Sequence, residues 1–210
     1  MLRYLHARDL AQYPRLRDSM HRDRADQFKR RLGWDVTVDD NGFERDQYDD
    51  LDPLYVIWEG PDGRHGGSAR FLPTTGRTMV NEHFLHLTDG VAFRSPFIWE
   101  CTRFCLAPQA QPRVASAIML GGGELMRAFS IDHYVGVFDA HMARVYRLMG
   151  VGPEVLGTSG SGKQAVSVGL WHYNFLLRDH LLAKAGLSSD LSEHWFNRAF
   201  GRPIDLAMTA

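Results

Sequence analysis

The sequence predicts an α/β sandwich built around one mixed β-sheet. Three observations support this prediction: a helical pattern occupies the N-terminal part, a run of strand-like segments follows, and the later part alternates strand, helix and strand. Such an order is typical of helices layered on a mixed sheet. The chain has 210 residues, which suits one domain, or at most two small ones, with a sizeable core.

The N-terminal part begins with a short strand, LRYLHA, and continues as a long helix from Asp9 to Leu32. Apolar side chains recur there at three- to four-residue spacing, at Leu10, Tyr13, Leu16 and Met20. Pro14 lies early, where a helix tolerates proline best, and Gly33 is expected to end the helix. Residues 35–53 are acidic and irregular, so we expect a long loop, a feature that in compact domains is usually functional or disordered.

The middle of the chain predicts three strands. PLYVIWE (53–59) and GSARFLP (67–73) read as two strands joined by the turn GPDGRHG. PFIWECTRFCLA (96–107) is long and mostly apolar, as a central strand of a sheet is.

The remaining elements alternate between the helical and the strand periodicity. Residues 112–130 read as a helix with Gly121–Gly123 as its weak point, and residues 141–149 as a helix that Gly150 ends. The other segments are three strands and a mostly helical tail: HYVGVFDA (133–140), GPEVLGT (152–158), QAVSVGLWHYN (164–174) and residues 174–200.

A glycine-rich stretch, GTSGSGKQ at residues 157–164, resembles the phosphate-binding P-loop G-x-x-x-x-G-K-[ST]. The eighth position, however, holds Gln164 in place of the hydroxyl that binds Mg²⁺. A P-loop leads into a helix, whereas Val166, Val168 and Leu170 alternate with small or polar residues, as in a strand. We therefore interpret the stretch as a hairpin turn and do not expect a nucleotide hydrolase.

Composition narrows the class of protein. With 44% hydrophobic and 23% charged residues, the chain reads as an ordinary globular protein, and its net charge of −1 gives no indication of nucleic-acid binding. No apolar run has the length of a signal peptide or a membrane span. The only cysteines, Cys101 and Cys105, imply no disulfide framework, so a cytoplasmic location is expected.

Charge is distributed unevenly. Residues 1–34 carry nine Lys or Arg and four Asp or Glu, whereas residues 35–62 carry ten Asp or Glu and one basic residue, Arg45. The two segments are either separate solvated surfaces or partners that face each other in an ion-pair cluster around a site.

Two groups of candidate functional residues lie in these segments. Arg24 and Phe28 are four residues apart and share one helix face, and Trp34 follows the helix. Asp46 and Asp49 lie in the acidic loop. The aromatic residues also suit a hydrophobic core, and the two carboxylates also suit a solvated loop.

A third group comprises Arg70, Glu100 and Arg103. Glu100 interrupts the most apolar strand, where a carboxylate is either paired or has a raised pKa. Glu100 and Arg103 are three residues apart, so strand geometry alone places them on opposite faces. A β-bulge, a feature common beside active sites, would redirect one of them.

In order and spacing, these residues resemble the acyl-homoserine lactone synthases, the autoinducer synthases of bacterial quorum sensing. The pattern is R-x3-F-x5-W, then D-x2-D, then R-x-L-P-T-T-G, then W-E-x-[ST]-R-F, with further similarity in LPTTGRTMVNEHF and DAHMARVYRLMGV. The resemblance covers residues 20 to about 150. It rests on eight residues: Arg24, Phe28, Trp34, Asp46, Asp49, Arg70, Glu100 and Arg103.

The resemblance implies a single autoinducer synthase domain over residues 1–210, with a mixed, mostly antiparallel sheet flanked by helices, similar to the N-acetyltransferase fold. It implies an acyltransferase that uses S-adenosylmethionine (SAM) as a substrate and an acyl thioester of acyl carrier protein or coenzyme A (CoA). No permanent cofactor, metal, nucleic-acid or membrane partner is expected. The products are then an N-acyl-homoserine lactone, methylthioadenosine and the free thiol. Two alternatives are a generic acyl-CoA N-acyltransferase and a non-catalytic regulator that binds SAM or an acyl carrier.

The side chains suit this chemistry. Carboxylates offset the cationic charge of SAM, and aromatic rings receive its sulfonium or adenine. The expected SAM-binding set is Arg24, Phe28, Trp34, Asp46, Asp49 and Arg103. Glu100, directly or through a water, is the candidate base for the protonated amine, and backbone N–H groups near residues 100–104 are candidates for binding the oxyanion. The expected catalytic set is Glu100, Arg103, Arg70, Asp46 and Asp49; the pairing between arginines and carboxylates stays open.

The expected acyl pocket is lined by Met119, Gly122, Gly136, Phe138 and Met142. By resemblance, Gly136 stands where synthases of 3-oxo-acyl products tend to carry Thr, so we expect free space there and a preference for 3-unsubstituted donors. Gly121–Gly123 indicate either further room or close helix–sheet packing. Arg144 and Arg147 share a helix face and are candidates to dock an acidic carrier protein, with a solvated face as the alternative.

Overall fold

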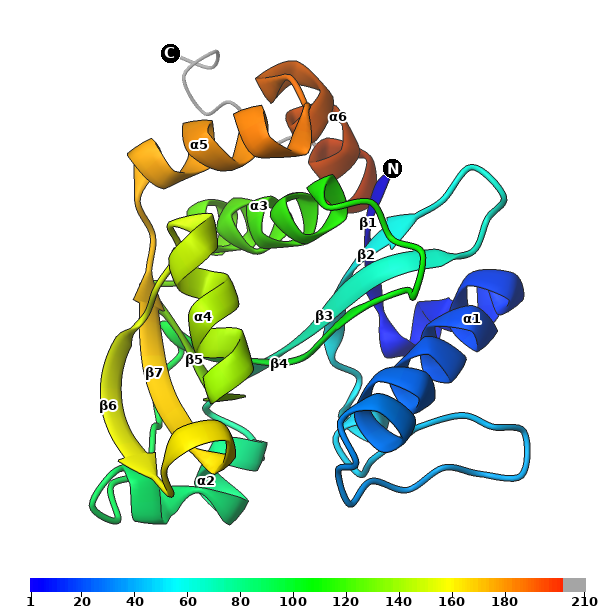
Figure 1. The fold of residues 1–210 in the computed structure, drawn as a ribbon. Helices are drawn as coiled ribbons and strands as arrows, with labels where there is room; N and C mark the ends of the chain where they lie inside the picture. The colour runs from blue at the N-terminus through cyan, green and yellow to red at the C-terminus, as the bar shows by residue number, and fades with distance from the viewer. Residues whose placement is uncertain (202–210) are drawn as a thin grey trace.

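The computed structural model describes residues 1–201. Its seven strands form one sheet in the order β1-β2-β3-β4-β5-β7-β6 (Figure 1). The strands are β1 (Leu2–His6), β2 (Leu54–Glu59), β3 (His65–Pro73), β4 (Ile98–Leu106), β5 (His133–Asp139), β6 (Glu154–Ser159) and β7 (Val166–His172). The α-helices are α1 (Pro14–Arg24), α2 (Met79–His83), α3 (Arg113–Phe129), α4 (Ala140–Met149), α5 (Phe175–Ala185) and α6 (Ser189–Phe200). The expected mixed sheet with flanking helices is confirmed. The last part of the expected domain, residues 202–210, lies outside the described residues.

The sheet opens in its middle. Neighbouring strands are antiparallel except for β4 and β5, which are parallel. This pair is hydrogen-bonded only from Ile98 to Glu100 and from His133 to Val135, although both strands continue. Beyond Glu100 the two strands diverge, while β5 stays paired with β7 along its whole length (Figure 1). The divergence leaves one edge of β4 without a strand partner.

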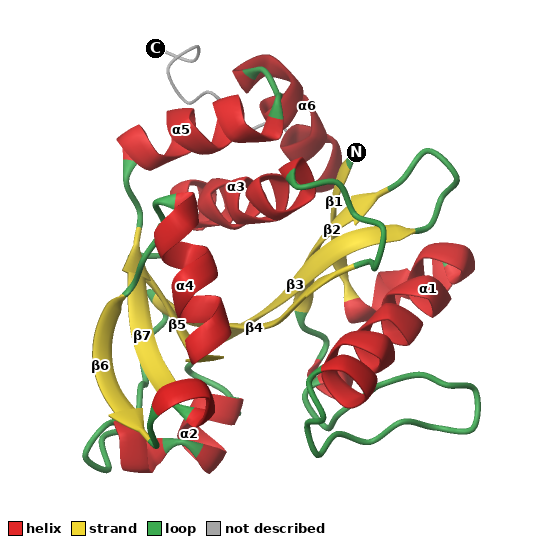
Figure 2. Ribbon diagram, viewed as in Figure 1, coloured by secondary structure: helices red, strands yellow, loops and turns green. Residues whose placement is uncertain are grey.

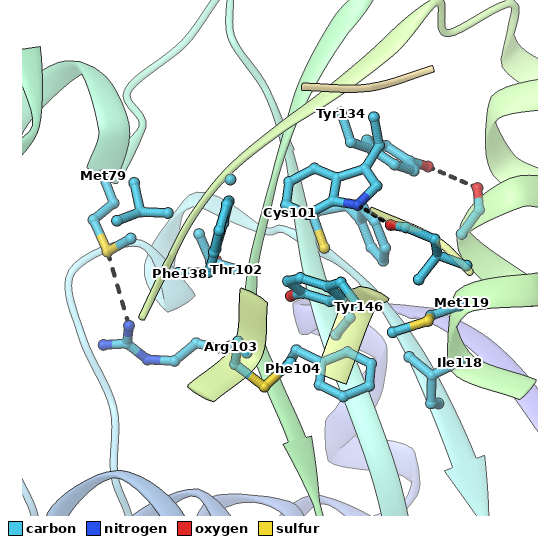
Figure 3. A pocket seen from close by; sticks show the side chains of 18 of the residues that line it. Met79, Cys101, Thr102, Arg103, Phe104, Ile118, Met119, Tyr134, Phe138 and Tyr146 are labelled. Atoms are coloured by element: carbon cyan, nitrogen blue, oxygen red, sulfur yellow. Dashed lines mark hydrogen bonds between the residues drawn. The ribbon is translucent and has the colours of Figure 1, made fainter. Parts of the chain in front are cut away.

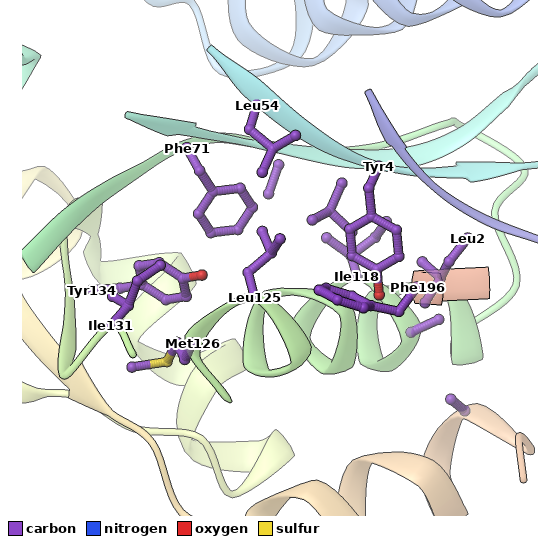
Figure 4. Close-up of a cluster of buried hydrophobic side chains, with 14 of the residues drawn as sticks. Leu2, Tyr4, Leu54, Phe71, Ile118, Leu125, Met126, Ile131, Tyr134 and Phe196 are labelled. Atoms are coloured by element: carbon purple, nitrogen blue, oxygen red, sulfur yellow. The ribbon is translucent and has the colours of Figure 1, made fainter. Parts of the chain in front are cut away.

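Helices cover the two faces of the sheet unequally (Figure 2). The main core lies between the sheet and α3 and includes Leu54, Phe71 and Leu125 (Figure 4). On the opposite face, Leu16 and Met20 of α1 pack against Tyr55 and Ile57 of β2. Strand periodicity explains this division, because successive side chains of β2 point to opposite faces. No helix among the described residues is long and apolar enough to cross a membrane.

The N-terminal helix differs from expectation. The helical stretch has three parts: a 3₁₀ helix (Ala7–Gln12), α1, and a π-helical segment (Ala25–Arg31). Pro14 begins α1, where its missing N–H has no helical partner to lose. The short helix α2 was not expected, because five residues are too few to show a helical period.

The glycine-rich stretch behaves as expected. Strands β6 and β7 are antiparallel neighbours, and a 3₁₀ turn (Gly162–Gln164) connects them. A P-loop needs a helix after the loop, so the hairpin interpretation is confirmed.

The three glycines of α3 have different surroundings. A Cβ atom on Gly121 would lie 2.5 Å from Cγ1 of Val56, a stiff side chain in β2. A Cβ atom on Gly123 would meet only the ring of Tyr173, at 3.9 Å. Gly121 is therefore needed for close helix–sheet packing, whereas Gly123 is not.

This difference predicts opposite effects of alanine in one helix. Gly121→Ala should lower the free energy of unfolding by about 1–3 kcal/mol, because the methyl group overpacks the core. Gly123→Ala should leave it unchanged or raise it by up to about 1 kcal/mol, because alanine favours the helix. Urea unfolding of both variants measures the difference, and equal stabilities would contradict this packing.

Candidate active site

Six charged side chains form a largely buried cluster where α1, the loop of residues 35–53 and strands β3 and β4 meet. They are three arginines and three carboxylates, so their charges balance: Arg24, Arg70, Arg103, Glu44, Asp46 and Asp49. The cluster joins the basic N-terminal segment to the acidic loop, which confirms the interpretation that the two segments face each other.

Arg24 is the anchor of the cluster on α1. It is fully buried, and its Nε donates to Oε2 of Glu44 at 2.5 Å. Its two terminal nitrogens donate to the two oxygens of Asp49 at 3.0 and 2.9 Å. The hydroxyl of Tyr55 donates to the same carboxylate. Planar two-point pairing of this kind fixes orientation as well as distance.

Arg70 and Arg103 hold the loop from the strands. Arg70 donates to both oxygens of Asp46, at 2.5 and 2.9 Å, and to Oγ1 of Thr102 at 3.0 Å. It also donates to Oδ1 of Asp49 at 2.8 Å. Arg103 lies 2.7 Å from Asp46 and donates to a Glu44 oxygen at 3.1 Å. The pairing that the sequence left open is thereby resolved.

A β-bulge brings Arg103 into the cluster. The pairing of β3 with β4 shifts between Ser68 and Arg70, and Arg103 has a φ of 53°, in the left-handed region. Thr102 and Arg103 both reach the Arg70 side of the sheet as a result. The expected bulge is confirmed, and it resolves the conflict between the spacing of Glu100 and Arg103 and strand geometry.

The arginines keep the two aspartates ionised. Burial by itself raises the pKa of Asp49, but Arg24 and Arg70 outweigh burial and hold this pKa well below its usual range. Burial likewise opposes ionisation of Asp46, and Arg70 and Arg103 lower its pKa below the ordinary value. Both carboxylates are therefore charged at neutral pH.

Glu100 has a different environment. It is buried, and its two carboxylate oxygens accept hydrogen bonds from the backbone N–H groups of Val80 and Met79, at 2.6 and 3.1 Å. Burial raises its pKa to about 7, although the two N–H groups oppose the shift. Glu100 thus holds the start of α2 and, unlike Asp46 and Asp49, has a pKa near neutral pH.

Phe28 and Trp34 form an aromatic pair beside the cluster. Their rings are stacked, with centroids 5.2 Å apart and an interplanar angle of 11°. The guanidinium of Arg103 lies 5.4 Å from the Phe28 ring centre. Phe28 is buried, whereas Trp34 is 37% exposed, so Trp34 offers the more accessible ring surface to a ligand.

A cavity of about 560 Å³ extends from this pair into the core between α3, α4 and the sheet (Figure 3). Phe28, Trp34, Asp46 and Arg103 line its polar end. The rest of the lining is mostly apolar and aromatic and includes all five residues expected for the acyl pocket: Met119, Gly122, Gly136, Phe138 and Met142. Between the two ends lie Cys101–Phe104, where β4 has left β5.

Four expected site residues lie behind this lining: Arg24, Asp49, Arg70 and Glu100. Each is buried and bonded to a lining residue or to a loop that carries one, so each positions the wall of the cavity. Arg24 and Asp49 were expected in the SAM site, Asp49 and Arg70 in the catalytic set, and Glu100 as a base that acts directly or through a water. These roles stay predictions.

The glycines also differ from expectation. A Cβ atom on Gly136 would lie 3.0 Å from the carbonyl oxygen of Cys101 and 3.1 Å from the Trp171 ring, so Gly136 does not leave the expected free space. Gly122 and Gly123 line the cavity, whereas Gly121 packs against β2. Close helix–sheet packing therefore applies to Gly121, whereas Gly122 and Gly123 contribute to the cavity.

Sequence reasoning missed Glu44, which bridges Arg24 and Arg103. Its only signal was its place among the many acidic residues of the loop. It also missed the aromatic cavity residues Tyr146 and Trp171. Their positions on a helix and a strand gave no sign that they face a cavity. Arg144 and Arg147 are exposed on α4, as docking or a solvated face would each require.

Comparisons with known proteins agree with this geometry. The family model for autoinducer synthases matches residues 9–172. An acyl-homoserine-lactone synthase of Rhizobium etli is 43% identical over 178 residues, covering 81% of this chain and 84% of that protein. One from Pseudomonas fluorescens is 32% identical over 139 residues, covering 65% of this chain and 69% of that protein.

Solved structures show the same fold. The crystal structure of the acyl-homoserine lactone synthase LasI has a TM-score of 0.74 at 26% identity, covering 87% of this chain and 94% of that one. The CoA-dependent synthase BjaI, solved with SAM and isopentyl-CoA, has a TM-score of 0.77 at 22% identity over 90% of each chain. A putative N-acetyltransferase from Lactobacillus plantarum has a TM-score of 0.55 at 13% identity, covering 82% of this chain and 99% of that one, which confirms the expected similarity of fold. Since the family model matches most of the sequence and a relative is 43% identical over most of both chains, the chain belongs to the autoinducer synthase family.

Proposed function

We propose that this chain is an acyl-homoserine lactone synthase, which transfers an acyl group from a thioester to the amine of SAM and then releases methylthioadenosine by lactonisation. The observation that carries the proposal is a single cavity with two chemically different ends. One end has an aromatic pair and an ionised aspartate, and the other is apolar and aromatic.

The polar end suits SAM. The carboxylate of Asp46 offsets the positive charge of the sulfonium and amine, and Trp34 offers an accessible ring for a cation–π or stacking contact. Arg103 reaches the same end and offers a guanidinium for the SAM carboxylate. Arg24, Arg70 and Asp49 hold Asp46 and its loop in place from behind.

The apolar end suits the acyl chain, and the reacting carbonyl then lies between the two ends, beside Cys101–Phe104. The edge of β4 has no strand partner there, so its backbone N–H groups can bind the oxyanion of the tetrahedral intermediate. The thiolate of the carrier leaves when this intermediate collapses.

The amine of SAM is protonated at neutral pH and must lose a proton before it attacks. Glu100 lies behind the lining and titrates near pH 7, so we assign it the role of base through an intervening water. Lactonisation needs mainly positioning, because the carboxylate of SAM displaces a sulfur that is already cationic.

The product tests the function directly. Incubation of the protein with SAM and a panel of acyl thioesters, on CoA and on acyl carrier protein, should give an acyl-homoserine lactone and methylthioadenosine in equal amounts by mass spectrometry. An acylated amine without lactone would indicate a generic N-acyltransferase. Ligand binding without any product would indicate a non-catalytic regulator.

The same assay addresses the carrier. We propose that an acidic carrier protein docks against Arg144 and Arg147. Reversal of both charges should then raise KM for the carrier-bound donor more than for acyl-CoA, and an equal effect on both donors would argue against docking there.

The role of Glu100 predicts a pH dependence. The ionised form is the base and burial raises the pKa to about 7, so kcat/KM should increase as the pH rises through 7. Glu100→Gln should lower turnover by roughly 10²–10⁴-fold and remove this rise. Glu154→Gln, a change at an exposed position of β6, is the matched control. Wild-type turnover in the Glu100 variant, with SAM binding intact, would refute the assignment.

A further inference from the structure

Tyr146 of α4 has no role in the site described so far, although it lines the middle of the cavity. Its ring meets Phe138 and Trp171 edge-on, with centroids 5.7 and 5.1 Å away. Trp171 is itself held by a 2.7 Å hydrogen bond from Nε1 to the Val151 carbonyl oxygen. These contacts fix the orientation of the Tyr146 ring, and with it the direction of the hydroxyl.

The hydroxyl of Tyr146 points into the cavity. Figure 3 shows its oxygen directed toward the part of β4 that carries Cys101, Arg103 and Phe104. Within residues 1–201 the structure gives this hydroxyl no hydrogen-bond partner. Tyr134, another tyrosine in the same lining, differs because its hydroxyl donates to the Gly122 carbonyl oxygen at 2.9 Å.

The unpaired hydroxyl is a ready donor. Burial, together with the nearby Cys101 and Asp139, raises the pKa of Tyr146 well above its usual value, so the phenol stays protonated. A fixed donor in an apolar, aromatic wall favours a ligand that carries an acceptor, because such a ligand displaces water from the cavity and keeps the hydrogen bond of the hydroxyl. A plain acyl chain has no acceptor beyond its carbonyl, and the carbonyl already has the free backbone edge of β4.

We infer that Tyr146 selects acyl donors that carry an oxygen at C3, either a hydroxyl or a keto group. The inference rests on the proposed function, because that function places the thioester carbonyl beside Cys101–Phe104. The first carbons of the acyl chain then lie next to the Tyr146 hydroxyl. A phenol donates to a keto oxygen, and it both donates to and accepts from a hydroxyl. This donor preference is opposite to the one expected from Gly136, where the Cys101 carbonyl and Trp171 fill the space.

The test compares donors with and without the oxygen. Unsubstituted, 3-hydroxy and 3-oxo acyl thioesters of one chain length on one carrier are given to the wild type and to Tyr146→Phe. The wild type should use at least one oxygenated donor roughly tenfold better by kcat/KM, the effect of one neutral hydrogen bond. Tyr146→Phe should bring this ratio close to one, because it lowers kcat/KM for the oxygenated donors more than for the unsubstituted donor.

Tyr134→Phe is the matched control, since it removes a hydroxyl from the same cavity wall that already has a protein partner. It should leave the donor ratio unchanged, whatever it does to stability. An equal loss on all three donors in Tyr146→Phe would place the hydroxyl on the thioester carbonyl or sulfur and overturn the inference, as would an unchanged ratio. Absence of lactone from the wild type with every donor would instead refute the proposed function, and the inference with it.

Discussion

The buried ion-pair cluster is the constraint on which the rest of the site depends. Arg24, Arg70, Glu44 and Asp49 are removed from water, Asp46 and Arg103 are mostly so, and the hydrogen bonds among the six groups offset the cost of that removal. Loss of one partner from such a cluster typically costs about 3–5 kcal/mol, because it leaves an uncompensated buried charge. The irregular loop of residues 35–53 has little secondary structure of its own, so these bonds largely determine its path.

The second constraint is the opening of the sheet between β4 and β5. Parallel pairing stops at Glu100, and three residues later the bulge at Arg103 turns that side chain toward the cluster. One short stretch of β4 therefore contributes to the ion-pair cluster and also exposes backbone groups to the cavity. This explains how a cationic substrate and an apolar chain can meet at one point of the fold.

The sequence was sufficient to predict the strands, because strands follow from local periodicity. It was also sufficient to predict the bulge, because Glu100 and Arg103 are three residues apart on one strand. Met119, Phe138 and Met142 line the cavity as expected. The sequence did not separate Gly121 from Gly122, since the difference depends on which face of α3 meets Val56. It also gave no partner for Glu100, because the groups that donate to its carboxylate are backbone N–H groups of a helix too short to show a periodic pattern.

The central claim is that the buried charges hold the loop and thereby form the SAM end of the cavity. Asp49 lies outside the lining and touches both Arg24 and Arg70, so Asp49→Asn tests the claim without removing a ligand contact. The neighbouring Asp50 is exposed and, within residues 1–201, pairs only with Arg45, so Asp50→Asn is its control. Amide hydrogen exchange over residues 35–53, measured with SAM affinity, should show faster exchange and at least roughly tenfold weaker binding in Asp49→Asn alone. Exchange and affinity equal to wild type in both variants would contradict the account.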